Sequence, residues 1–65
     1  MLAYQHLIDE VKILRAEVNS LGNEYILCQN PHLRYALLTT ITELTNRIVD
    51  AQREILSYLR GHGQP

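Results

Sequence analysis

Apolar residues recur every three or four positions through the first half of the chain. The series is Tyr4, Leu7, Val11, Leu14, Val18, Leu21, Tyr25 and Cys28. This spacing predicts one apolar seam along a helix from about residue 3 to about residue 28. Valine at the middle a positions and leucine at d are typical of helices that pair in small bundles. Gly22 costs about 1 kcal/mol relative to alanine inside a helix, but the seam continues past it, so we expect one unbroken helix.

A clear break separates the two halves at Asn30 and Pro31. Asparagine before a helix accepts a hydrogen bond from a free amide of the first turn, and proline suits the first helical position because that position needs no amide hydrogen. A second helix is therefore predicted from Pro31 to about Arg60, where Gly61 offers a left-handed C-terminal cap. Its seam is Leu37, Ile41, Leu44, Ile48, Ala51, Ile55 and Tyr58.

The connection at Gln29 and Asn30 is short, which forces neighbouring antiparallel helices. We therefore predict an all-α fold, an antiparallel two-helix hairpin (about 3–28 and 31–60) that associates into a helical bundle. Residues 1–60 form its single domain and residues 61–65 a flexible C-terminal tail. In this arrangement Tyr4 and Tyr58 meet at the open end.

Both helices carry more apolar side chains than their mutual contact can cover. A chain of 65 residues buries only about 60% of the surface that its unfolded form exposes, so uncovered apolar surface favours association. Tyr35 either closes the end of the core with its hydroxyl toward water or anchors an interface. Ile13 belongs to the surplus as well. The predicted partner-binding residues are Tyr35, Leu38, Val49, Leu56, Leu59, Ile8 and Ile26.

Charge and hydropathy argue against nucleic acids and membranes as partners. Six basic residues stand against seven acidic ones, for a net charge of −1, and the basic residues are scattered along the chain, which argues against a nucleic-acid partner. No apolar run approaches the roughly 20 residues that span a bilayer, and no signal-peptide pattern is present. We expect a cytoplasmic protein that does not interact with membranes.

Few residues are candidates for metal binding or catalysis. His6 and Glu10 lie one helical turn apart, but two ligands make an incomplete metal site. Cys28 and His32 face each other across the turn as a possible zinc or nucleophile pair, although Cys28 also fits a d position as a small buried hydrophobe. Threonine is a mediocre helix former, and four threonines occur at positions 39, 40, 42 and 45. Either tertiary packing overrides this low propensity, or the threonines form a face that hydrogen-bonds a partner or tolerates remodelling. We expect no enzyme activity, catalytic residue, metal or cofactor.

The second half of the chain resembles the small co-chaperones of type III secretion needle subunits. The pattern consists of Asn30 and Pro31 at the helix start, Tyr35 in the first turns, regularly spaced isoleucine and leucine, and the late aromatic Tyr58. The resemblance covers mainly residues 30–58. It implies a short antiparallel hairpin that pairs with a larger helical-repeat chaperone. Together the two proteins of that family keep the polymerising needle subunit soluble in the bacterial cytoplasm.

These observations predict a non-catalytic protein–protein interaction module that acts as a chaperone or adaptor. Its partner is a second copy, forming a homodimer, a larger helical protein, or both. The alternative is a small oligomeric regulator of the phage or plasmid type that binds a nucleotide or nucleic acid at a subunit interface. Arg34, Arg47, Tyr35 or His32 would form that site.

Overall fold

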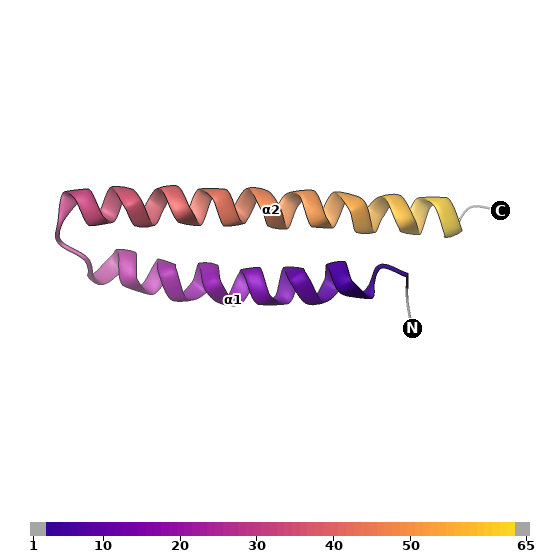
Figure 1. Cartoon of the computed structure of the whole chain (residues 1–65), viewed down its shortest axis with the longest axis horizontal. Coiled ribbons are helices and arrows are strands. Elements are labelled where there is room, and N and C mark those ends of the chain that lie inside the picture. Colours follow the sequence, from indigo (N-terminus) through magenta and orange to yellow (C-terminus); the bar gives the residue numbers. More distant parts are fainter. Residues whose placement is uncertain (1–2, 64–65) are drawn as a thin grey trace.

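The chain forms an antiparallel hairpin of two helices, which confirms the predicted all-α fold. The computed structural model describes residues 3–63. Helix α1 spans Gln5–Leu27 and helix α2 spans Pro31–Gly63. The two helices run side by side for the whole length of α1, and the C-terminal end of α2 projects beyond it (Figure 1).

Helix α1 lies within the predicted range and ends slightly inside it on both sides. Its first turn is anchored where the amides of Leu7 and Ile8 donate to the Tyr4 carbonyl. The helix passes through Gly22 without interruption, as the continuous seam predicted. It stops at Leu27, after which Cys28 takes an extended backbone conformation.

The turn is built around Asn30, as predicted. The Asn30 Oδ1 atom accepts hydrogen bonds from the amides of His32 at 2.9 Å and Leu33 at 3.2 Å. Its own carbonyl accepts the amide of Arg34 at 2.9 Å. Asn30 therefore satisfies amides that have no partner within the helix, and Pro31 occupies the position where no amide hydrogen is needed.

The C-terminal end of α2 differs from the prediction. The helix does not end at Arg60 with a left-handed cap at Gly61 but continues to Gly63, and no glycine among the described residues has a positive φ. Glycine permits the left-handed conformation without requiring it. Residues 61–63 of the expected tail therefore belong to the helix, and residues 64–65 lie outside the described part of the chain.

The core lies in the half of the hairpin nearest the chain termini. It consists of six buried side chains: Leu7, Val11 and Leu14 of α1, and Leu44, Ile48 and Ala51 of α2. Tyr4, Val18, Leu21, Ile55 and Tyr58 pack partly buried around them. The rings of Tyr4 and Tyr58 lie 5.9 Å apart between centroids, so these residues meet at the open end as predicted.

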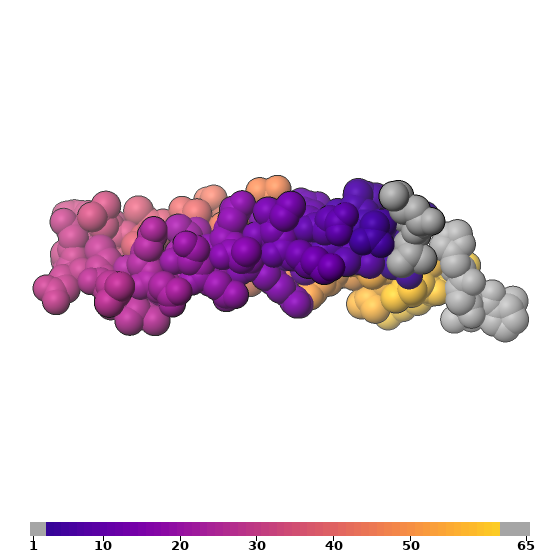
Figure 2. Space-filling model, turned by 90° about the horizontal axis from the view of Figure 1, so that it is seen from below, coloured from indigo at the N-terminus to yellow at the C-terminus, as the bar shows by residue number. Residues whose placement is uncertain are grey.

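This core is thin. None of the described residues is less than 2% exposed, and the hairpin measures 54 × 17 × 12 Å. Its radius of gyration is 15.4 Å, whereas a compact chain of this length has about 11 Å. The space-filling view shows the resulting narrow rod, with α1 in front of α2 (Figure 2). Every side chain is therefore close to the surface, and each helix has a single partner.

Candidate interaction surface

Two long flanks of the hairpin remain open to solvent, one on each side of the helix pair. Arg47 and Glu10 mark one flank, where Arg47 Nη2 lies 3.3 Å from Glu10 Oε1 across the two helices. Each of these residues stands one position before a seam residue. Since the helices are antiparallel and each residue turns by about 100°, the residues one position after the seam residues share the opposite flank.

That opposite flank carries seven large apolar side chains, five of them on α2, and no acidic residue, and we call it the apolar flank. Its members are Ile8, Lys12, Arg15, Asn19, Gly22, Ile26, Tyr35, Leu38, Thr42, Thr45, Val49, Gln52, Leu56 and Leu59. All seven predicted partner-binding side chains lie on it. Ile8 is half-buried, and the other six are exposed, from 37% for Val49 to 74% for Tyr35 and Ile26. The pairing of the helices thus gathers these side chains on one side of the molecule.

Helix α2 supplies most of this surface as an uncharged stripe. From Tyr35 to Leu59 it contains no ionisable side chain other than the tyrosine. The Thr42 and Thr45 hydroxyls donate to the carbonyls of Leu38 at 2.9 Å and Ile41 at 2.7 Å within the same helix. Thr39 and Thr40 do the same with the carbonyls four residues before them. The threonine donors are therefore occupied within α2, which removes the basis for a threonine face that donates to a partner.

The first flank is strongly acidic, and we call it the acidic flank. It carries Glu10, Glu17, Glu24, Glu43, Asp50 and Glu54, which are six of the seven acidic residues. Arg47 is its basic member, and it pairs with Glu10 of the other helix instead of with Glu43 one turn away. Sequence reasoning considered only the scattered basic residues and missed this segregation of the acidic residues. Their position one residue before the seam was the signal that could have revealed it.

Arg34 connects the two helices at the turn end of the hairpin. Its Nη1 donates to the carbonyls of Tyr25 at 3.0 Å and Cys28 at 2.8 Å, and its guanidinium lies 4.1 Å from the centroid of the Tyr25 ring. The Tyr25 carbonyl lies in the last turn of α1, where it also accepts the Cys28 amide at 3.3 Å, and the Cys28 carbonyl directly follows the helix. Arg34 therefore closes the C-terminus of α1, a role that sequence reasoning missed because it depends on the return of α2.

The side chains considered for a nucleotide or nucleic-acid site are dispersed. Arg34 is engaged at the turn, Arg47 is bound to Glu10 on the acidic flank, and Tyr35 is exposed on the apolar flank. His32 is exposed in the first turn of α2. Monomeric hairpins do not bring these four groups together.

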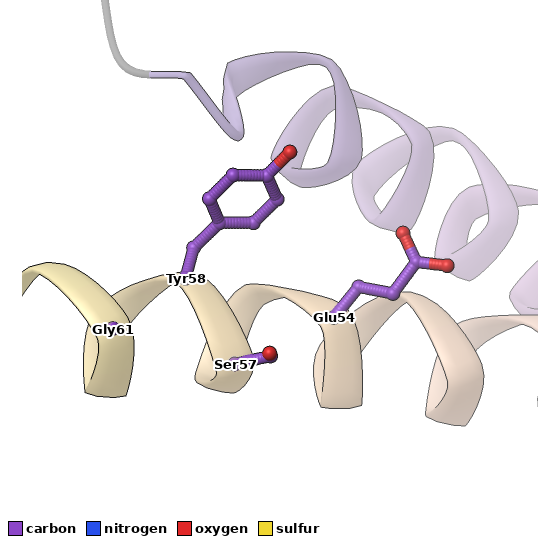
Figure 3. A pocket seen from close by; sticks show the side chains of 4 residues that line it. All are labelled: Glu54, Ser57, Tyr58 and Gly61. Carbon is purple, nitrogen blue, oxygen red and sulfur yellow. The ribbon is translucent and has the colours of Figure 1, made fainter.

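Shallow hollows occur on the acidic flank. One is lined by Glu54, Ser57, Tyr58 and Gly61, and in it the Tyr58 ring reaches from α2 toward α1 (Figure 3). Two others share His6, Glu10 and Arg47. Their volumes of about 210, 300 and 380 Å³ lie below or near the lower end of the range for ligand pockets, which begins at about 300 Å³.

The candidate metal and nucleophile pairs have other contacts. Glu10 binds Arg47, and the Cys28 thiol donates to the Asn30 carbonyl at 3.6 Å. Within residues 3–63 no cluster of three or more histidine, cysteine or carboxylate side chains is arranged to hold a metal ion. Neither described helix contains an apolar stretch that could cross a membrane.

Comparisons of the chain with protein families, with curated proteins and with solved structures give no match. The resemblance to needle-subunit co-chaperones therefore rests on the sequence pattern between Asn30 and Tyr58.

Proposed function

We propose that this chain is a non-catalytic protein–protein interaction module, a helical hairpin that acts as a chaperone or adaptor through its apolar flank. One observation carries the proposal: five of the six large exposed apolar side chains of α2 share an uncharged stripe, with Leu33 as the exception, while six of the seven carboxylates lie on the other side. Leu38, Val49, Leu56 and Leu59 are between 37% and 50% exposed. Side chains of this kind gathered on one face are typical of interaction surfaces.

The thin core supports the same proposal. Six buried residues, three from each helix, cannot shield the apolar residues of both flanks. The apolar residues at positions 38, 49, 56 and 59 are separated by gaps that are sums of three- and four-residue steps, so they lie on one face of α2. Helices dock into grooves or bundles through a face of this kind. A helical partner surface would cover this stripe and leave the acidic flank in water.

The resemblance described above suggests the biological setting. A larger helical protein is one partner that fits the stripe, and the cytoplasm is the compartment in which a needle-subunit co-chaperone works. The proposal accordingly includes a chaperone role in the cytoplasm.

A pair of adjacent substitutions on opposite flanks tests the proposed function. Leu56→Asp puts a carboxylate in the apolar flank, whereas Ser57→Asp puts it on the acidic flank next to Glu54. Both positions are exposed, so both variants should keep the helical circular dichroism of the parent. Tagged wild-type and variant hairpins are co-expressed with untagged hairpin and with the proteins encoded beside the gene, and the bound proteins are quantified.

We expect Leu56→Asp to lose the proteins retained by the wild type and Ser57→Asp to keep them. If wild type and Leu56→Asp retain the same proteins in the same amounts, the apolar flank does not bind a partner. In that case the proposed function is wrong.

A further inference from the structure

We infer that the apolar flank is covered by a second copy of this chain, with the two α2 helices antiparallel across a two-fold axis that passes close to Val49. This inference rests on the proposed function and names the partner. It follows from three properties of the hairpin: the symmetry of the α2 stripe, the distribution of charge, and the exposed area.

The stripe on α2 is nearly symmetric about Val49. Leu38 precedes Val49 by eleven residues and Leu59 follows it by ten. An antiparallel pairing centred there sets Leu38 against Leu59 of the other copy at both ends of the interface. It also sets Leu56 against Thr42 and Val49 against itself. A two-fold interface requires such self-complementarity, because each contact occurs twice.

The distribution of charge permits a dimer through the apolar flank and opposes a dimer through the acidic flank. Thr42, Thr45 and Gln52 complete the stripe without a charge, so that no like charges meet where the two α2 helices touch. The basic members of the apolar flank, Lys12 and Arg15, lie on α1. The donors of both threonine hydroxyls are already used within α2. Contact through the acidic flanks would instead bring six carboxylates of each copy together, which is costly for like charges.

The exposed area matches what a stable dimer needs. The chain exposes 5137 Å², whereas a compact monomer of its mass exposes about 4,250 Å². The excess of roughly 900 Å² belongs to the whole rod, and it is large enough to supply the approximately 800 Å² that each partner buries in an interface of standard size. A face-to-face pair of hairpins also gives a four-helix bundle, in which each helix gains a second neighbour.

Single cysteines in a Cys28→Ser background test the geometry, because a disulfide requires Cα atoms within about 7 Å. Val49→Cys should form a disulfide-linked dimer under mild oxidation, since the two copies of residue 49 face each other. Leu38→Cys and Leu59→Cys should each fail to link to themselves, because their copies lie about 30 Å apart along an antiparallel helix pair. A mixture of these two variants should link to each other. Thr40→Cys, on the acidic flank, is the control that should remain monomeric.

Light scattering of the full chain gives an independent reading. We expect a mass twice the chain mass of 7.5 kDa at micromolar concentration, and the single-chain mass for Leu56→Asp with its helical spectrum retained. Cross-linking of Leu38→Cys and Leu59→Cys each to itself would show parallel helices and overturn the inferred arrangement.

A monomeric wild type would overturn the second copy as partner. The proposed function is tested separately. If the wild type is monomeric but still retains other proteins, and Leu56→Asp loses them, the chain is an interaction module with a different partner. If neither binds anything, both fail.

Discussion

Truncation of Leu14 tests whether the six-residue core holds the hairpin together. Leu14 is 4% exposed and packs in the buried cluster with α2 residues. Leu14→Ala removes three carbon atoms, which at about 0.8 kcal/mol per buried methylene amounts to about 2.4 kcal/mol. The cavity adds little, because neighbouring half-buried side chains can move into it. We therefore expect a loss of about 2.5–3 kcal/mol, the lower part of the range for such truncations.

That loss is large for a chain of this size. At about 0.05–0.15 kcal/mol per residue, the whole hairpin is stable by roughly 3–10 kcal/mol. Urea unfolding followed by circular dichroism, at one fixed protein concentration, measures the difference between variant and wild type. The fixed concentration matters because association would add to the apparent stability.

Ile13→Ala is the matched control, one residue away in the same helix. Ile13 is 61% exposed and lies on the acidic flank, outside the apolar flank. Its truncation should change the free energy of unfolding by less than about 0.5 kcal/mol, since the side chain is already in water. If Ile13→Ala costs as much as Leu14→Ala, the helices do not pack through the seam described here.

Three further predictions follow from the backbone and from charge. Gly22→Ala should raise the stability by about 1 kcal/mol, because an added Cβ meets nothing within 4 Å; a lower melting temperature would contradict a straight, uncrowded helix at this point. Asn30→Ala should cost about 1 kcal/mol in urea unfolding while Asn30→Asp keeps most of the stability, because only alanine lacks the capping oxygen; equal losses would exclude the cap. Arg47→Ala should change the stability by less than about 0.5 kcal/mol, because the side chains of Arg47 and Glu10 are 61% and 41% exposed; a larger loss in thermal melts at physiological salt would show a stronger bridge.

The hairpin itself could be predicted from local patterns. The spacing of apolar residues places each seam on one side of its helix because a helix has a constant turn per residue. The cap at Asn30 follows from the chemistry of two adjacent residues, and the shortness of the turn forces the antiparallel arrangement. None of these features depends on a distant part of the chain.

The composition of the two flanks depended on the pairing of the helices. The periodicity of α1 assigns Glu10 to one side of its seam, but only the antiparallel approach of α2 puts Arg47 on the same side. The same approach unites Ile8 and Ile26 with the stripe on α2. A partner-binding surface formed by two helices therefore cannot be derived from either helix alone.

The partners of Arg34 and the helical conformation of Gly61 were visible only in the structure. Arg34 reaches the end of α1 because α2 returns beside it, and a flexible side chain selects its partner from whatever the fold brings near. Gly61 remained helical although it could have ended α2, because glycine accepts both conformations at similar cost. Apolar spacing is encoded locally, whereas contacts between distant residues depend on the folded arrangement, and a glycine near a helix end does not by itself fix where the helix stops.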